Sequence, residues 1–229
     1  MLTSKQMDSI RSAIVKVGAA RGFIIESRRD VRPSRFVTER LVVTAAHCLP
    51  HLPPSLPSIF PHERTYESLL GALDAEKPEV RAECVFADPV ADIAVLFHPD
   101  DQVYEDATAY DELTEGPPAL PVGRPALMGA AWLLALDGRW VSAPYTTGPH
   151  NVGLWLEEAQ EIQPGMAGSP ILAQGGAAIG LVSAAWDSTG RNGLTERLTS
   201  GPQPTLMQHL PGWVISGLQN SSLAEGGVR

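Results

Sequence analysis

The sequence predicts an all-β protein whose short antiparallel strands form a barrel or a sandwich, with a short helix at each end. Short apolar runs typical of strands recur between turns rich in glycine and proline. No helical pattern alternates with these runs, as it would in a parallel α/β sheet. The chain has 229 residues, 44% of them hydrophobic, which is enough to bury a substantial core in one all-β domain.

The elements follow one another as this fold class requires. A short helix is predicted directly after Thr3, which serves as its N-cap. Residues 50–61 predict a proline-rich loop, residues 105–121 an acidic helix followed by a linker, and residues 203–219 a helix interrupted at Pro211. The predicted strands are residues 13–18, 22–27, 40–45, 92–97, 130–136, 152–158, 169–173 and 177–186.

The charge of the chain excludes two classes of partner. The formal net charge is −9 and no cluster of lysine and arginine offsets it, which argues against nucleic acid and anionic membranes. The basic run at residues 26–35 is interpreted as a solvated loop. The N-terminus lacks the apolar core of a secretion signal, and no apolar run is long enough to span a bilayer. Two cysteines are too few for a disulfide framework, so we expect a cytoplasmic protein with free thiols.

Three short motifs carry residues that are able to do chemistry. "VVTAAHC" places His47 where an apolar strand turns, and "DPVADIAVL" places Asp92 at the start of another. A carboxylate in such a position has to be paired or hydrogen-bonded. "GMAGSP", residues 165–170, holds glycines that let backbone N–H groups converge as in an oxyanion hole. Each motif alone has an ordinary structural explanation, but their order His, Asp, loop is one known arrangement for Ser-His-Asp catalysis.

These residues resemble the trypsin-like serine peptidases, which have the chymotrypsin fold, and the resemblance covers about residues 13–219. "VTAAHC" is similar to the family's histidine motif, "DIAVL" to its aspartate motif and "PGMAGSPI" to the bacterial form of its serine motif. "IGLVSAA" resembles the strand that lines the primary specificity pocket. The resemblance is most specific to intracellular bacterial trypsin-like domains.

The resemblance implies two six-stranded antiparallel β-barrels with a short N-terminal helix and a C-terminal helix. It also implies one peptidase domain over residues 1–229. Its expected parts are an N-terminal lobe at about 13–104, a linker at about 105–121, a C-terminal lobe at about 122–202 and a C-terminal helix at about 203–219.

The serine motif lacks its nucleophile. Counting back from Pro170 places Ala167 at the nucleophile position. Ser169 lies two residues too late and directly before a proline, which argues against a displaced nucleophile. Two explanations stay open: a Ser-to-Ala substitution made to inactivate the enzyme, or a natural pseudoprotease that binds peptides or proteins without cleaving them.

With serine at position 167, the resemblance implies that His47 is the general base and that Asp92 orients its ring. The backbone N–H groups of Gly165 and residue 167 are expected to bind the oxyanion, and Ser183 to bond Asp92. The implied substrate pocket consists of Glu161, Ser183, Ala184 and Ala185. Glu161 lies six residues before the nucleophile position, where trypsin has the acid that selects arginine or lysine; an exposed loop acid is an equal alternative.

We therefore expect a serine endopeptidase that cleaves a protein or peptide substrate, in a bacterial stress or defence system. The sequence calls for no cofactor. The other histidines share no ligand spacing with each other or with the cysteines, so no metal site is predicted. Two features depart from the secreted relatives: no cleavage signal precedes "AIVKVG", and Cys48 lacks the family's upstream cysteine partner.

Overall fold

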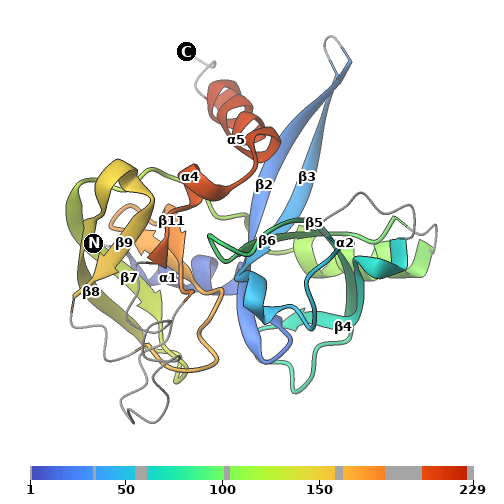
Figure 1. The fold of residues 1–229 in the computed structure, drawn as a ribbon, viewed down its shortest axis with the longest axis horizontal. Helices are drawn as coiled ribbons and strands as arrows, with labels where there is room; N and C mark the ends of the chain where they lie inside the picture. Colours follow the sequence, from blue (N-terminus) through green and yellow to red (C-terminus); the bar gives the residue numbers. More distant parts are fainter. Residues whose placement is uncertain are drawn as a thin grey trace.

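The computed structural model describes residues 2–32, 35–54, 61–100, 104–157, 162–183 and 203–225. They form two six-stranded antiparallel β-barrels with a helix near each end of the chain, which confirms the predicted fold class (Figure 1). The predicted substrate-pocket residues Glu161, Ala184 and Ala185 lie outside the described residues.

The N-terminal barrel is closed, with the strand order β1-β2-β3-β6-β5-β4. Its inward-facing side chains, such as Ile24, Val42 and Leu96, are fully buried. Consecutive apolar residues along β2, β3 and β6 alternate between this interior and a second core, in which Val43 and Val95 cluster with Leu181 of the C-terminal lobe. The strands are β1 Ile14–Val17, β2 Ala20–Arg32, β3 Arg35–Thr44, β4 Thr65–Ala72, β5 Val80–Asp88 and β6 Ile93–Phe97.

The C-terminal lobe is a six-stranded sheet in the order β11-β10-β7-β8-β9-β12. A bridge between Gly180 and Thr205 brings the two ends of the sheet together, and the core includes Leu133, Leu154 and Ile171. The strands are β7 Met128–Leu134, β8 Trp140–Thr147, β9 Gly153–Leu156, β10 Pro170–Ala173, β11 Ala178–Leu181 and β12 Gln203–Pro204.

The helices lie where the sequence predicts them: α1 Ser4–Ser12, α2 Tyr104–Glu115, α4 Leu206–His209 and α5 Gly212–Glu225. Thr3 caps α1, because its hydroxyl accepts from the Gln6 N–H while the Gln6 side chain accepts from the Thr3 N–H. Helices α4 and α5 are separated by Pro211, as predicted, because proline cannot continue the hydrogen-bond ladder of a helix. The acidic helix α2 occupies most of the predicted linker.

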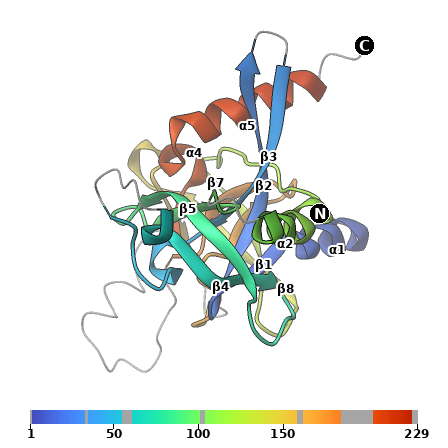
Figure 2. The same cartoon turned by 90° about the vertical axis from the view of Figure 1, so that its right-hand side faces the viewer.

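The interpretation of residues 26–35 as a solvated loop was wrong. Of these residues, 26–32 belong to β2 and Arg35 begins β3, and the two strands pair from Gly22↔Thr44 to Arg32↔Arg35 as a long hairpin. The far half of this hairpin extends beyond the barrel beside α5 (Figures 1 and 2). Opposite charges across the hairpin stabilise it: Arg29 pairs with Glu39 at 2.8 Å, and Arg40 with Glu26 at 3.2 Å.

Four strands, β4, β5, β8 and β12, are missing from the predicted set. Strand β12 lies at residues 203–204, in the segment predicted as a helix, and the other three have an interrupted apolar pattern. The pairing of β4 with β5 shifts between Tyr66 and Leu70, and that of β5 with β6 shifts between Cys84 and Phe86. Such irregularities break the strict alternation by which a strand is recognised. Strand β8 contains Pro144, a residue that normally argues against a strand.

We expect Gly217→Ala to destabilise the protein by about 1–3 kcal/mol, because α5 packs on the hairpin backbone at this glycine. A Cβ atom there would lie 2.1 Å from Ser27 Oγ and 2.9 Å from the Arg28 nitrogen. Gly212→Ala is the matched control in the same helix, since a Cβ atom there would meet nothing within 4 Å. Urea unfolding of both variants measures the difference, and equal stabilities would contradict the close packing.

Candidate active site

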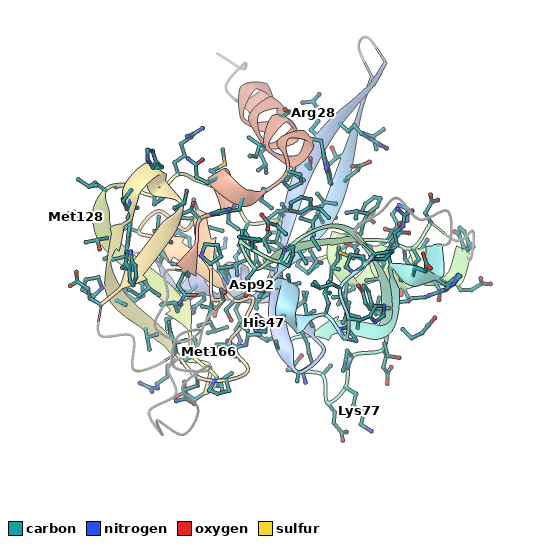
Figure 3. All side chains as sticks on the ribbon, viewed as in Figure 1. Arg28, His47, Lys77, Asp92, Met128 and Met166 are labelled. Carbon is teal, nitrogen blue, oxygen red and sulfur yellow. The ribbon has the colours of Figure 1, made fainter. Side chains whose placement is uncertain are left out.

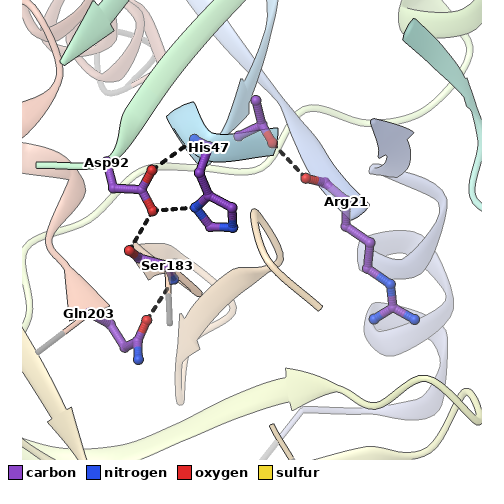
Figure 4. Close-up of polar contacts among 6 residues, drawn as sticks. Arg21, His47, Asp92, Ser183 and Gln203 are labelled. Carbon is purple, nitrogen blue, oxygen red and sulfur yellow. Dashed lines mark hydrogen bonds and ion pairs between the residues drawn. The ribbon is translucent and has the colours of Figure 1, made fainter. Parts of the chain in front are cut away.

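His47 and Asp92 are brought together by the ends of two barrel strands. β3 ends at Thr44, and the 3-10 turn Ala46–Cys48 carries His47 away from the buried Ala45. The backbone N–H of His47 donates to Asp92 Oδ1 at 2.9 Å, and ring atom Nδ1 lies 2.7 Å from Asp92 Oδ2 (Figure 4). This double contact fixes the ring through Nδ1, so Nε2 is the ring nitrogen that Asp92 does not occupy.

Asp92 joins the two lobes. It precedes β6 of the N-terminal barrel in a left-handed conformation, with φ of 58°. Ser183, which follows β11 of the C-terminal lobe, donates its hydroxyl to Asp92 Oδ2 at 2.5 Å. The structure therefore places Ser183 against Asp92.

Gln203 is a residue of this network that the sequence analysis missed. Its side-chain oxygen accepts from the Ser183 N–H at 2.6 Å, and the residue is 5% exposed at the start of β12 (Figure 4). It thereby holds the serine that bonds Asp92. No local motif marks it, because it lies 20 residues beyond Ser183 in the segment predicted as a helix.

The two groups shift each other's protonation. The hydrogen bond with Asp92, helped by the neighbouring Cys48 thiol, raises the pKa of His47 above its ordinary value of 6.5. Burial tends to raise the pKa of Asp92, but the hydrogen bonds from His47 and Ser183 outweigh burial and hold that pKa below its usual value. Asp92 is therefore the ionised partner that stabilises a proton on His47.

The loop around Ala167 is built by two glycines in left-handed conformations, Gly165 with φ of 95° and Gly168 with φ of 77°. The Met166 N–H donates to Gln163 O at 3.0 Å, and the Gly168 N–H donates to Val182 O at 2.6 Å. The second bond ties the loop to the residue directly before Ser183. Among the described residues, the N–H groups of Gly165 and Ala167 have no acceptor.

Position 168 requires glycine for two reasons: its backbone is in the left-handed region, and there is no space for a Cβ atom. A Cβ atom there would lie 1.9 Å from Arg21 O and 2.5 Å from Thr44 Oγ1. The loop thus lies directly against β2 and the end of β3, three residues before His47. This contact places the Ala167 loop at the seam between the lobes, and Figure 3 shows its neighbour Met166 in the same central region of the view as His47 and Asp92.

Ser169 is placed where it is unable to act as a nucleophile. The residue is fully buried, and its N–H and C=O are bonded to Met166 and Val182. Its hydroxyl has no hydrogen-bond partner among the described residues. The structure therefore agrees with the sequence argument against Ser169.

The described residues offer neither a metal site nor a helix that could span a membrane. No group of three His, Cys, Asp or Glu side chains lies close enough to hold a metal ion. No helix in the described ranges has the length and apolar character needed to cross a bilayer.

Both cysteines are free thiols, as the sequence predicted. Cys48 is partly exposed, whereas Cys84 is 3% exposed and donates to Phe86 O. Burial raises the pKa of the Cys84 thiol to about 12, so at neutral pH it is almost wholly protonated and unreactive.

We expect a thiol reagent such as DTNB to modify Cys48 in the native protein and to leave Cys84 unmodified. In guanidinium chloride both thiols react, without any reductant. Cys84→Ala is the control, which should leave the native reaction unchanged and halve the reaction in denaturant. A native titration that counts no thiol, with a mass two protons low, would instead indicate a disulfide.

The comparisons with known proteins agree with this geometry. The family model described as "Trypsin-like peptidase domain" matches residues 20–181, which include His47, Asp92 and Ala167. The chain belongs to the trypsin-like peptidase family. No curated protein matches the sequence.

Solved structures similar to the chain include two bacterial proteins and one viral protein. An inactive form of mutant Rv3671c from M. tuberculosis H37Rv is 19% identical over 99% of this chain and 94% of that one, with a TM-score of 0.45. A structure reported for the Sesbania mosaic virus VPg protein is 13% identical over 88% of both chains, with a TM-score of 0.51. The MamO protease domain from Magnetospirillum magneticum is 16% identical over 91% and 96%, with a TM-score of 0.46. At these identities the likeness concerns the fold alone.

Proposed function

We propose that the chain is a serine endopeptidase framework that hydrolyses peptide bonds of a protein substrate when serine occupies position 167. The observation that supports this most is the network of His47, Asp92 and Ser183, which joins both lobes at the seam. The Ala167 loop is bonded to Val182, the residue next to this network, and presents two N–H groups without an acceptor in the described parts of the chain.

Each group has a role that follows from its chemistry. The hydroxyl at position 167 attacks the substrate carbonyl carbon, and His47 takes its proton at Nε2 and later returns it to the leaving amine. Asp92 keeps the Nδ1 proton on the ring and stabilises the imidazolium through its negative charge. The N–H groups of Gly165 and residue 167 stabilise the oxyanion of the tetrahedral intermediate. Water then hydrolyses the acyl-enzyme by the same route.

With Ala167, the attacking oxygen is the one group of the proposed mechanism that the described site residues lack. Loss of a nucleophile lowers kcat by about a million-fold, while binding contacts made by the rest of the cleft persist. The same residue supports the second candidate, a natural pseudoprotease that uses this cleft to bind a peptide or protein segment. The two candidates differ in whether restoring a hydroxyl restores hydrolysis.

We also propose Glu161 as the acid that selects arginine or lysine at the residue before the cleaved bond. It lies six residues before position 167 in sequence. A carboxylate that meets a guanidinium in a pocket forms a charge-assisted, often bidentate contact, which discriminates far more strongly than an apolar slot.

The test is to profile a peptide library with the Ala167→Ser chain, the unmodified chain and the Ala167→Ser, Glu161→Gln double variant. We expect the Ala167→Ser chain to cleave peptides and the unmodified chain to cleave none. In the cleaved peptides, arginine and lysine should be enriched before the cleaved bond. We expect the Gln variant to lose this enrichment. A folded Ala167→Ser chain that cleaves nothing favours the pseudoprotease, and an unchanged preference in the Gln variant makes Glu161 a surface acid.

A further inference from the structure

Arg21 is a buried cation whose side chain has no role in the mechanism proposed for His47, Asp92 and the Ala167 loop. It is 6% exposed near the start of β2, and its guanidinium donates to Leu134 O at 2.5 Å and to Ala135 O at 3.2 Å. No carboxylate pairs with it within the described ranges. Burial and the nearby charge of Arg11 lower the pKa of Arg21. Burying this charge without a carboxylate costs free energy, which the hydrogen bonds to Leu134 O and Ala135 O offset in part.

The backbone of Arg21 binds the Ala167 loop and the segment that leads to His47. Its N–H donates to Ala167 O at 2.9 Å, and its C=O accepts from Thr44 Oγ1 at 2.7 Å. Gly168 packs on the same carbonyl so tightly that a Cβ atom would lie 1.9 Å from it. In Figure 4 the side chain of Arg21 runs away from His47.

The two ends of Arg21 therefore connect the lobes. Its backbone belongs to the N-terminal barrel, and its guanidinium donates hydrogen bonds at the end of β7 in the C-terminal lobe. His47 and Asp92 come from the first lobe, whereas Gly165 and Ala167 come from the second. The distance between base and nucleophile position thus depends on contacts across the seam. Misplacement by about 1 Å costs about 100-fold in rate.

We propose that Arg21 is a positioning residue that holds the Ala167 loop and the β7–β8 turn in register with His47. This inference rests on the proposed peptidase function for its effect on rate. Its structural part, the clamping of one loop and one turn, stands independently. A residue with a merely structural role would instead stabilise all of the barrel equally.

The experiment compares Arg21→Met, Arg21→Lys and Arg29→Met in the chain with Ala167, by hydrogen exchange. Methionine keeps an apolar side chain of similar length but removes the N–H groups that donate to Leu134 O and Ala135 O. Lysine keeps the positive charge but has a single nitrogen instead of the two that bind these carbonyls. Arg29 lies on the same strand with a side chain 66% exposed, so Arg29→Met is the matched control. For Arg21→Met we expect exchange at least about tenfold faster in residues 163–169 and 134–139, with Val43 and Val95 unchanged. We expect a smaller but equally local effect for Arg21→Lys. We expect no change in either segment for Arg29→Met, which removes only the pair with Glu39 in the hairpin.

The second arm repeats the variants with Ala167→Ser and measures modification by a fluorophosphonate. We expect Arg21→Met to lower the rate constant about 10- to 100-fold, with the midpoint of its pH dependence unchanged, because the His47–Asp92 contact is untouched. If the Ala167→Ser parent is not modified, the peptidase proposal fails while hydrogen exchange still decides the role of Arg21. Exchange that is unchanged, or faster throughout both barrels, overturns the inference. If Arg21→Met does not fold, Arg21→Lys decides by the same criterion.

Discussion

Replacing His47 by alanine in the Ala167→Ser chain will lower peptide hydrolysis about a million-fold. The imidazole is the base of the described network, and a carboxylate holds it through Nδ1. Without it, the hydroxyl has no acceptor for its proton, so the loss equals that of removing the nucleophile itself. The measurement is kcat on a fluorogenic peptide taken from the library profile.

His51→Ala is the control for the loss of a histidine from the same lobe. His51 is exposed and packs against Tyr66, with 4.8 Å between ring centroids. We expect kcat to change by less than about threefold in this variant. Similar losses in both variants would show that His47 acts through stability, and a small loss in His47→Ala would remove it from the mechanism.

Asp92→Asn in the Ala167→Ser chain will lower kcat about 10⁴-fold, since an amide no longer fixes the productive tautomer or stabilises the imidazolium.

The pH dependence of the rate is a second observable for the same variant. His47 has to be neutral to accept a proton, so the rate of the Ala167→Ser chain should rise with pH through the pKa of His47. Asp92 raises that pKa, which places the midpoint above about 6.5. Asp92→Asn should move the midpoint to lower pH while lowering the plateau.

Asp137→Asn is the matched control, because Asp137 pairs with Arg139 on an exposed turn of the C-terminal lobe. We expect both the plateau and the midpoint to stay unchanged in this variant. A midpoint that does not move in Asp92→Asn would mean that the short His47–Asp92 contact does not govern the protonation of the ring.

The fold class and the pairing of His47 with Asp92 could be predicted because their signals are local. His47, Asp92 and Gly165 each lie in a motif of a few residues, at a strand end or a turn where the sequence constrains the backbone. The N-cap at Thr3 and the helix break at Pro211 could also be predicted, because each depends on a single residue.

The rest depends on contacts between distant segments. Gln203 holds Ser183 from 20 residues away, and Arg21 reaches Leu134 over 113 residues. The charges of residues 26–35 obscured a hairpin whose opposite charges come from the other strand, at Glu39 and Arg40. Pairing partners and bulges of this kind are set by the tertiary structure and leave no periodic pattern in either segment.

The most direct test of the peptidase framework is to map where a fluorophosphonate binds covalently to the Ala167→Ser chain. Intact mass and peptide mapping should show one adduct, on the residue at position 167, and none when His47→Ala is added or when position 167 is alanine. A folded protein without an adduct, or an adduct on Ser169, would contradict the site described above.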